Sequence, residues 1–370
     1  MSKAMLFSDL HVHSHKGKID RLDDCLKTLE WIFKESKNHE CKYILFLGDL
    51  FHDRAKIDVL TYLRTFEAFM NEADPNQEIY LLVGNHDMYH RERWDVNSVK
   101  PLTAIPNVHI VDEPSTINIG GRNVDWIPHT EDPIKEAKKL KEGRDKKDLT
   151  LLLGHMAIDN AILNTMYGTK ADVIVEYDTG MKTVDVSIFD DWSNGRVFLG
   201  HYHGAQHLND HVEYLGSPLQ LSYGEAFQEK HIAVLDLKTL EYEYIINDFS
   251  PKHLILEKNE INEHNLKGNF TRIVCDDMSA KDLIDIKLDL MQKHEVASFD
   301  FKQRERKEDE EAKIEEARAI LFKHDEMLEK WLEEKTVPEG LDKGFLLEIG
   351  KKIIANQDEE GSLLKELLDS

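Results

Sequence analysis

Short apolar strands followed by polar motifs recur through roughly the first 245 residues. The five stretches with this pattern read AMLFSDLH, YILFLGDLFH, IYLLVGNHD, LTLLLGHM and RVFLGHYH. Several of these strands are apolar throughout, which indicates that both of their faces are covered. Helical patterns separate the first strands, over residues 22–36 and 58–73. The alternation of strands and helices predicts an α/β layered fold.

Later strands follow one another without intervening helices. They read HVEYLGS, KHIAVLDL and EYEYIIN. For residues 1–249, a β-sandwich flanked by helices therefore fits the pattern better than a purely parallel sheet.

The pattern changes after residue 249. Residues 250–303 combine three short strands with one helix, expected over 280–293, and predict a small α+β module. Residues 304–370 are rich in charge, with apolar residues at helical spacing. One amphipathic helix carries Ile314, Ala317, Leu321, Leu328 and Trp331, and a second one, after the break TVPEG, carries Leu341, Phe345, Ile349 and Ile353. Such helices are expected to dock on another helix or a coiled coil, or alternatively to fold back on the first domain.

Composition narrows the classes of function. The chain has 370 residues, of which 41% are hydrophobic, as in an ordinary globular protein. It has no apolar run long enough to cross a bilayer and no signal-peptide pattern, so we expect a cytoplasmic protein without membrane contact. The net charge of −24 argues against a free-standing nucleic-acid binder. It does not exclude a nuclease, because two bound divalent cations add positive charge at the site itself.

The polar motifs offer a set of metal ligands. Each candidate follows an apolar strand by one to three residues, where loops converge at a sheet edge. The candidates are Asp9, His11, Asp49, Asn85, His155, His201 and His203. Mixed oxygen and imidazole ligands suit manganese, iron or zinc. Seven groups exceed the needs of one ion and match two, which a carboxylate such as Asp49 can bridge at roughly 3.5–4 Å; such a pair can acidify a water and clamp a phosphate during in-line attack.

The stretch DLHVHSH, residues 9–15, leaves a second interpretation open. In metal phosphoesterases of the polymerase-and-histidinol-phosphatase type, His11 and His13 would form the ligand pair. That type needs further motifs that we cannot place in order, whereas the two-metal arrangement uses every later motif. We therefore expect His13 and His15 to be loop residues rather than ligands, with a phosphate contact as the alternative for His13.

Together the motifs D-x-H, G-D-x-x-H, G-N-H-D, G-H and G-H-x-H, over residues 9–203, resemble the calcineurin-like metallophosphoesterase family. Two sequence stretches, GDLFH and the YLGSPLQLSYGE that follows the last motif, are similar to those of the SbcD-type nuclease subunits of recombination and repair, including shorter versions in tailed phages. The characteristic Y-x-G-S-P segment with a later Glu matches Tyr214, Gly216, Ser217, Pro218 and Glu225. In that family a nuclease domain precedes a capping module and C-terminal helices, here 1–249, 250–303 and 304–370.

The resemblance implies two divalent ions, with manganese as the metal. One ion would be held by Asp9, His11, Asp49 and His203, and the other by Asp49, Asn85, His155 and His201. His86 would stabilise the transition state or protonate the leaving oxygen, a role that suits an imidazole because its pKa lies near neutral pH. Asp87 would orient the ring of His86, or else cap a turn. His52 would contact the substrate backbone, or else be a buried structural histidine.

The resemblance also implies a function and partners. The chain would be a two-metal DNA exonuclease or endonuclease that acts on duplex ends or single strands. An SbcC-type SMC-like ATPase would bind residues 304–370, and two copies of the chain would pair through the helix of residues 58–73. Arg91 and Arg93 closely follow the G-N-H-D motif, and we expect them to reach the DNA backbone. The alternatives are a small-molecule or nucleotide phosphodiesterase on the same fold, and a structural subunit with a vestigial site.

Overall fold

The structure is a computed structural model that describes residues 2–14, 19–142, 149–159, 161–167, 173–177, 183–275, 280–303, 344, 346 and 347. By its internal contacts the chain divides into one unit of Met1–Lys302 and another of Gln303–Ser370. The architecture below is that of the first unit. The amphipathic helices expected over residues 304–370 lie almost wholly outside the described residues.

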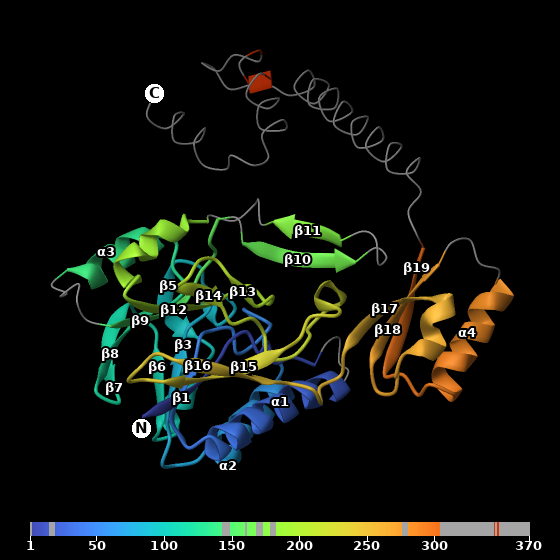
Figure 1. Cartoon of the computed structure of the whole chain (residues 1–370), viewed down its shortest axis with the longest axis horizontal. Helices are drawn as coiled ribbons and strands as arrows, with labels where there is room; N and C mark the ends of the chain where they lie inside the picture. The colour runs from blue at the N-terminus through green and yellow to red at the C-terminus, as the bar shows by residue number, and fades with distance from the viewer. Residues whose placement is uncertain are drawn as a thin grey trace. The chain divides into compact units, whose positions relative to one another are not determined.

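Two six-stranded sheets form the body of this unit (Figure 1). The first sheet has the order β16-β15-β1-β2-β3-β6. Its strands are β1 (Lys3–Phe7), β2 (Cys41–Phe46), β3 (Glu78–Leu82), β6 (Val108–Val111), β15 (His231–Asp236) and β16 (Tyr242–Ile246). The strands β1, β2, β3 and β6 run parallel, while β15 and β16 join the sheet antiparallel.

The second sheet repeats this plan in the order β13-β14-β12-β9-β8-β7. Its strands are β7 (Ser115–Ile119), β8 (Arg122–Ile127), β9 (Thr150–His155), β12 (Gly195–Gly200), β13 (Gln206–His207) and β14 (Val212–Tyr214). Four neighbours, β8, β9, β12 and β14, run parallel. Two hairpins lie outside both sheets, namely β4 (Met88–His90) with β5 (Arg93–Asn97), and β10 (Ile162–Tyr167) with β11 (Val173–Tyr177).

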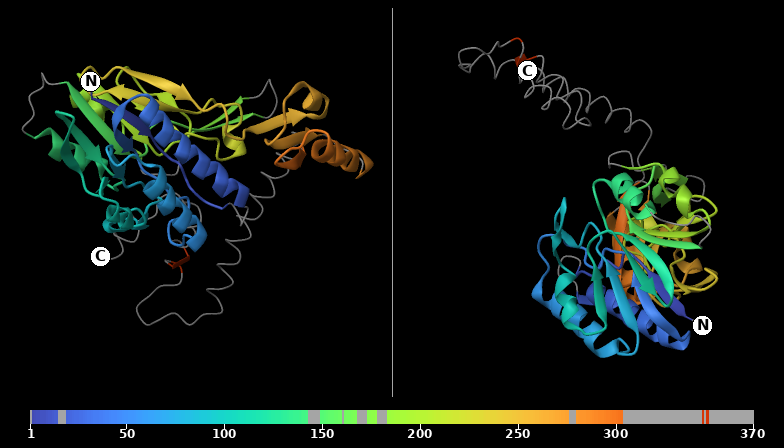
Figure 2. Two further views of the ribbon diagram at one scale, coloured as in Figure 1. Left: turned by 90° about the horizontal axis from the view of Figure 1, so that it is seen from below. Right: turned by 90° about the vertical axis from the view of Figure 1, so that its left-hand side faces the viewer.

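Helices cover the outer face of each sheet. The helices α1 (Ile19–Asn38) and α2 (Val59–Glu72) lie side by side along the first sheet (Figure 2). The second sheet is covered by α3 (Pro133–Lys141) and by the 3-10 helix η2 (Val186–Trp192). Among the described helices, none combines the length and hydrophobicity that crossing a bilayer requires.

The core explains why the strands are apolar on both faces. Successive side chains of a strand point to opposite faces. Along β1, Ala4 and Leu6 pack between the sheets with Trp126 of β8, while Met5 and Phe7 pack under the helices. All five side chains are at most 1% exposed. The predicted α/β class follows directly from this layering.

The two helices expected in the first part of the sequence are present. Residues 22–36 lie within α1, and residues 58–73 correspond to α2 with one flanking residue at each end. Asp58 caps α2, because its carboxylate accepts a hydrogen bond from the backbone N–H of Thr61 at 2.9 Å.

A small α+β module follows, in which the three-stranded sheet β17-β18-β19 packs against α4. Its elements are β17 (His253–Glu257), the 3-10 helix η4 (Lys258–Glu263), β18 (Phe270–Cys275), α4 (Ala280–Gln292) and β19 (Ser298–Gln303). Leu256, Ile273, Ile286 and Leu290 form a core of its own. The helix predicted over residues 280–293 is therefore confirmed to within one residue.

Candidate metal centre

The seven candidate ligands come together at one edge of the two sheets. They lie at or just after the C-terminal ends of β1, β2, β3, β9 and β12, which are parallel strands of their sheets. Loops at such strand ends converge in α/β folds, because parallel strands all end at the same edge. Asp9, Asp49 and His155 are at most 1% exposed, whereas His201 and His203 are partly exposed. The group therefore has a buried floor and an open side.

Asp9, His11 and His203 form a first group. Their ligand atoms lie within 4.8 Å of one another. Nε2 of His11 is 3.0 Å from Nε2 of His203 and 3.9 Å from Oδ1 of Asp9. The backbone N–H of His201 donates to both carboxylate oxygens of Asp9, at 3.2 and 3.1 Å, and so fixes that carboxylate. Two ring nitrogens and a carboxylate that face one point suit a shared divalent cation.

Asn85, His155 and His201 surround a second point. Oδ1 of Asn85 lies 2.9 Å from Nε2 of His155 and also 2.9 Å from Nδ1 of His201. Nδ1 of His155 donates to the carbonyl of Leu47 at 2.7 Å. This bond fixes the ring and directs Nε2 at the oxygens, as expected for a metal-ligating histidine.

Asp49 lies between the two groups. Its Oδ2 is 3.5 Å from Nε2 of His11 and 3.4 Å from Nε2 of His155. Its Oδ1 accepts a hydrogen bond from the backbone N–H of His86 at 2.7 Å. One oxygen is thus tied to the backbone while the other adjoins both groups, which is the placement that a bridging carboxylate needs.

The charges of the site fit divalent cations. Burial alone would raise the pKa of Asp49, but the imidazoles of His155 and His11 outweigh it and hold this pKa well below its usual value. Burial likewise would lower the pKa of His155, yet the carboxylates of Asp49 and Asp9 raise it to about 9. The proton on Nε2 of His155 therefore lies among acceptor oxygens, where a divalent cation would replace it.

In two other candidate ligands, His11 and His201, burial shifts the pKa in the opposite direction. Burial lowers the pKa of His11 well below its usual value, and it lowers that of His201 to about 3. A neutral imidazole is the form that binds a metal. The donor set, with two carboxylates, one amide oxygen and four imidazoles, fits a pair of transition-metal ions.

The backbone is strained at the ligands. Positive φ angles occur at Asp9 (51°), His11 (47°), Asp49 (62°) and His201 (112°). Each such angle in a non-glycine residue costs on the order of 1–3 kcal/mol, and such residues cluster at functional sites. Close packing also requires the glycine of G-N-H-D, because a Cβ on Gly84 would lie 2.2 Å from Oδ1 of Asp49. The loops are thus built around the positions of the ligand atoms.

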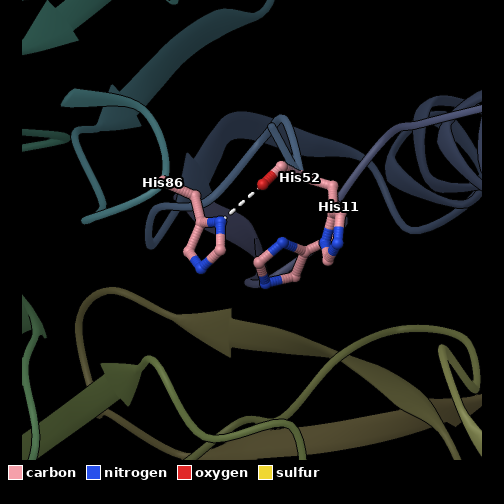
Figure 3. Close-up of side chains that lie close together, drawn as sticks. All are labelled: His11, His52 and His86. Carbon is pink, nitrogen blue, oxygen red and sulfur yellow. Dashed lines mark hydrogen bonds between the residues drawn. The ribbon is translucent and has the colours of Figure 1, made fainter. Parts of the chain in front are cut away.

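His52 and His86 lie beside His11 (Figure 3). The ring centroid of His86 is 4.9 Å from that of His11 and 5.6 Å from that of His52. Nδ1 of His86 donates to the backbone carbonyl of His52 at 2.5 Å, which leaves Nε2 for another partner. His86 is partly exposed and His52 is exposed, so His52 is not the buried structural residue that was its alternative.

Asp87 has a role other than the orientation of His86 expected from the sequence. Its Oδ2 accepts from the backbone N–H groups of Asp49, at 2.8 Å, and Gly84, at 3.0 Å. Its Oδ1 accepts from the backbone N–H of Leu50 at 3.0 Å. The ring of His86 is held by the carbonyl of His52 instead. Asp87 therefore ties the G-D loop to the G-N-H-D loop, which corrects its expected role and agrees with the turn-capping alternative.

His13 is not among the groups of candidate ligands found in the described part of the chain. Its Nδ1 lies 2.6 Å from the carbonyl oxygen of His11, and its ring centroid is 4.5 Å from that of His52. It is 7% exposed and supports the ring of His52. A ligand pair of His11 and His13 is therefore not formed, and His15 lies outside the described residues.

Sequence patterns did not identify three further residues near the site. Glu225 was noted only as part of a motif, yet it accepts a hydrogen bond from Nδ1 of His203 at 3.0 Å. Arg54 is partly buried, and burial together with the charge of nearby Arg91 lowers its pKa. His129 follows β8 by two residues and its ring centroid is 6.2 Å from that of His201. Glu225 had a signal in the YLGSP segment with its later Glu, and His129 had the same strand-end placement as the candidate ligands.

Arg91 and Arg93 differ in their surroundings. The guanidinium of Arg93 is paired with the carboxylate of Asp95, with contacts of 3.0 and 2.5 Å. Arg91 lies close enough to Arg54 to lower its pKa, and neither forms an ion pair with a carboxylate in the described part of the chain. The carboxylate of Asp49 offsets part of this repulsion at Arg54, and two neighbouring guanidinium groups favour an anion beside them.

Residues 2–205 match the profile of a family described as calcineurin-like phosphoesterases. The chain belongs to this family. The family binds divalent metals, and the matched span includes every candidate ligand, so the two groups of side chains are candidate metal sites of a metallophosphoesterase. This match also decides against the polymerase-and-histidinol-phosphatase type as the explanation of the first motif.

Comparison with individual proteins shows distant relatives of this phosphoesterase. Exonuclease subunit 1 of Enterobacteria phage T4 is 25% identical over 202 residues, which are 54% of this chain and 55% of that protein. The chain therefore spans about half the length of this curated relative.

Two solved structures are also similar. A novel archaeal phosphodiesterase has 14% identity and a TM-score of 0.32, with 66% of this chain and 99% of that chain covered. The Pseudomonas putida nuclease MPE has 19% identity and a TM-score of 0.25, with 42% and 64% covered. These TM-scores are low, so the assignment of this phosphoesterase rests on the family match.

Proposed function

We propose that this phosphoesterase is a two-metal DNA nuclease that hydrolyses phosphodiester bonds as the nuclease subunit of an SbcCD-like complex in DNA repair, recombination or replication. The observation that carries the proposal is the convergence of seven ligand side chains from five strand ends, with Oδ2 of Asp49 between the two groups. The distant similarity to a phage exonuclease subunit supports DNA as the substrate.

The residues divide into two ligand sets that share Asp49. The first set is Asp9, His11, Asp49 and His203, and the second is Asp49, Asn85, His155 and His201. When bound, two manganese ions would supply Lewis acidity to a phosphate and lower the pKa of a water molecule. The chain's own contribution is to hold the ligand atoms at fixed distances on a floor from which water is excluded.

We assign to His86 the role of protonating the leaving oxygen. Its Nδ1 is bound to the carbonyl of His52, so Nε2 is the atom that can hold a proton for transfer. The ring is partly exposed on the open side of the site, next to the exposed ring of His52. His52 would contact the phosphodiester backbone on that side.

The basic residues beside the site would bind the phosphates of the DNA backbone. In a chain with a net charge of −24, Arg91 and Arg54 offer neighbouring positive charges to phosphates, although the charge of Arg54 also interacts with Asp49. The charge of Arg93 is partly neutralised by Asp95. Contacts of this kind position the substrate without reading its sequence.

We also propose two protein partners. An SbcC-type SMC-like ATPase would bind the amphipathic helices of residues 304–370, which lie almost wholly outside the described residues. A second copy of the chain would pair through α2, whose outer side exposes Val59 (83%), Leu60 (45%), Leu63 (49%) and Met70 (53%). An apolar stripe of this kind on a surface helix is typical of a helix-packing interface.

The experiment that tests the proposal compares two substrates with manganese present. End-labelled linear duplex DNA and a chromogenic phosphodiester are incubated with the purified chain, with and without the candidate ATPase. We expect DNA to be cleaved. Turnover of the chromogenic diester without any cleavage of DNA would instead support the small-molecule phosphodiesterase, and failure to turn over either substrate in protein that binds manganese would support a structural subunit.

A further inference from the structure

Glu225 binds the ligand ring of His203 at the nitrogen opposite the metal-facing one. Nδ1 of His203 donates to Oε1 of Glu225 at 3.0 Å, while Nε2 of the same ring meets Nε2 of His11 at 3.0 Å. Glu225 is 1% exposed, so water does not compete for this bond. A carboxylate behind a ligating imidazole fixes both its tautomer and its orientation. The direction of His203 towards the first metal site is therefore set by Glu225.

Buried neighbours hold Glu225 in turn. Nζ of Lys230 lies 2.7 Å from Oε2 of Glu225 and donates to the backbone carbonyl of His203 at 2.8 Å. The hydroxyl of Ser217 and the backbone N–H of Leu221 donate to the same Oε2, at 3.1 and 3.2 Å. Lys230 is 6% exposed, so each charge is compensated mainly by the other. Glu225 cannot turn away from His203 without leaving Lys230 unpaired.

The turn that carries Glu225 also contacts the α+β module. This turn is the 3-10 helix η3 (Tyr223–Glu225). The guanidinium of Arg272, on β18, lies 4.0 Å from the centre of the Tyr223 ring. Two hydrogen bonds to Asp300 of β19, at 2.8 and 2.7 Å, hold that guanidinium in place. One short turn thus joins the support of a metal ligand to the sheet of the module.

We propose that Glu225 is a positioning residue for His203. We further propose that the contact of Arg272 with Tyr223 makes the affinity of the first metal site depend on how the α+β module packs against η3. The inference rests on the proposed two-metal centre but not on DNA as the substrate. Residues 250–303 then contribute to the metal centre without supplying a ligand to it.

The test is manganese binding by the full chain, measured by calorimetry and by electron paramagnetic resonance. In Glu225→Gln, one of the two sites loses affinity by about 10–100-fold, the range typical of residues behind a ligand, and the other site is retained. Glu229→Gln makes the same change of charge at an exposed position of the same segment and leaves both affinities unchanged. Two wild-type affinities in Glu225→Gln would overturn the role of Glu225.

A second variant separates positioning from folding. Glu225→Gln leaves Lys230 buried without its carboxylate, which can unfold the chain. The double variant Glu225→Gln with Lys230→Met removes both charges, and its thermal melt reports whether it is folded. The folded double variant is still expected to lose the first site, and two wild-type affinities in it would again overturn the inference. A wild-type chain that binds fewer than two ions would instead overturn the two-metal centre itself.

Arg272→Ala tests the part played by the module. It removes the contact with Tyr223 and lowers the affinity of the first site by roughly 2–10-fold, because the stack fixes η3 only in part. In the Glu225→Gln background the same change has no further effect, since both act through His203. Lys258→Ala breaks a 3.1 Å ion pair with Asp282 inside the module and serves as the control with unchanged affinity. Unchanged manganese affinity in Arg272→Ala would refute the contribution of the module.

Discussion

At the scale of single residues, one polar atom of several candidate ligands forms a hydrogen bond within the protein, and this bond determines which other atom can face a metal. Nδ1 of His155, Nδ1 of His203 and Oδ1 of Asp49 each hold a supporting bond, so the remaining atom of each group faces the metal positions. Nδ1 of His86 is engaged in the same way, and its ring lies in a further group, with His11 and His52, whose atoms could also hold a metal. We therefore propose that the first three residues hold metals and that His86 acts on the substrate.

The first prediction concerns His86. In His86→Ala the two ligand sets are intact, so we expect manganese content to stay at the wild-type level. Cleavage of DNA should fall by about 10²–10⁴-fold, the usual contribution of general acid–base catalysis. Elemental analysis and a nuclease assay measure the two effects.

His90→Ala is the control, because His90 is an exposed histidine on the neighbouring hairpin. Wild-type cleavage by His86→Ala would refute the catalytic assignment, and loss of its metals would make His86 a ligand.

A second prediction compares two arginines of one loop. Arg91→Glu should weaken DNA binding and reduce the slope of log affinity against log salt by about 1, because one phosphate contact is lost. Arg93→Glu should have a smaller effect, since Arg93 is already paired with Asp95. Titrations at several salt concentrations give both slopes. Equal slopes for Arg91→Glu and wild type would eliminate Arg91 as a DNA contact.

At the scale of elements, the parallel strands place the ligands and the helices leave faces for other contacts. The helix α2 buries Thr65, Ala68 and Phe69 against the first sheet. Its exposed side carries four apolar residues, Val59, Leu60, Leu63 and Met70, together with the polar Glu67. Four exposed apolar side chains are more than a helix that faces only solvent needs. The strand β15, by contrast, begins with a partly buried ionisable group, His231.

The third prediction tests pairing through α2. Leu63 is 49% exposed, so Leu63→Glu introduces charge into the stripe without disturbing the core. We expect a wild-type dimer and a folded Leu63→Glu monomer in light scattering coupled to gel filtration. Glu67→Gln, on the same helix, should leave the dimer intact. A dimer of unchanged stability in Leu63→Glu would show that another surface pairs, or that none does if wild type is monomeric.

The fourth prediction is a pH dependence at His231. Burial, with the charges of Lys230 and His207, lowers its pKa to about 4, compared with about 6.5 in an unfolded chain. The unfolded chain therefore takes up the proton first, and His231 lowers the free energy of unfolding as pH falls from about 6.5 to 4. In His231→Gln this decline should be smaller by about 1–3 kcal/mol, because the ring is partly exposed.

Urea unfolding at pH 4.5 and pH 7 measures that difference. His264→Gln, at an exposed position, should retain the full wild-type decline. An identical decline in wild type and His231→Gln would mean that His231 is not held neutral in the folded protein.

At the scale of the whole molecule, the chain divides after Lys302 into two units. The unit of Met1–Lys302 has its own sheets, cores and metal centre, none of which uses residues 304–370 in the described part of the chain. The fifth prediction follows. Deletion from Arg304 onward should abolish binding of the ATPase but spare cleavage of a small chromogenic diester, because the ligand sets remain complete.

A pull-down and a diesterase assay on the same preparations measure both properties. Retained ATPase binding by the truncated chain would place the docking surface within residues 1–303. Loss of diesterase activity in a folded truncated chain would show that the metal centre needs the C-terminal residues.

The sequence predicted the layered α/β fold and the convergence of the candidate ligands because both follow from the order of strands and motifs along the chain. A ligand such as Asn85 stands directly after an apolar strand, and parallel strands end together. The supports of the ligands were not predictable in this way. Glu225 reaches His203 from 22 positions away, and Asp87 binds the backbone of Asp49 from 38 positions away. Such contacts depend on how the loops pack in three dimensions, and the hydrophobic pattern of a single strand does not predict that packing.

The position of one oxygen, Oδ2 of Asp49, has a consequence for how the protein responds to its surroundings. If two cations bind as proposed, the first would draw on the negative charge that the second also needs, and it would repel the second cation. The two loading steps should therefore differ in affinity, so that half-loaded protein persists over a range of manganese concentrations. Supply of the metal in the cell would then govern what fraction of the molecules is active.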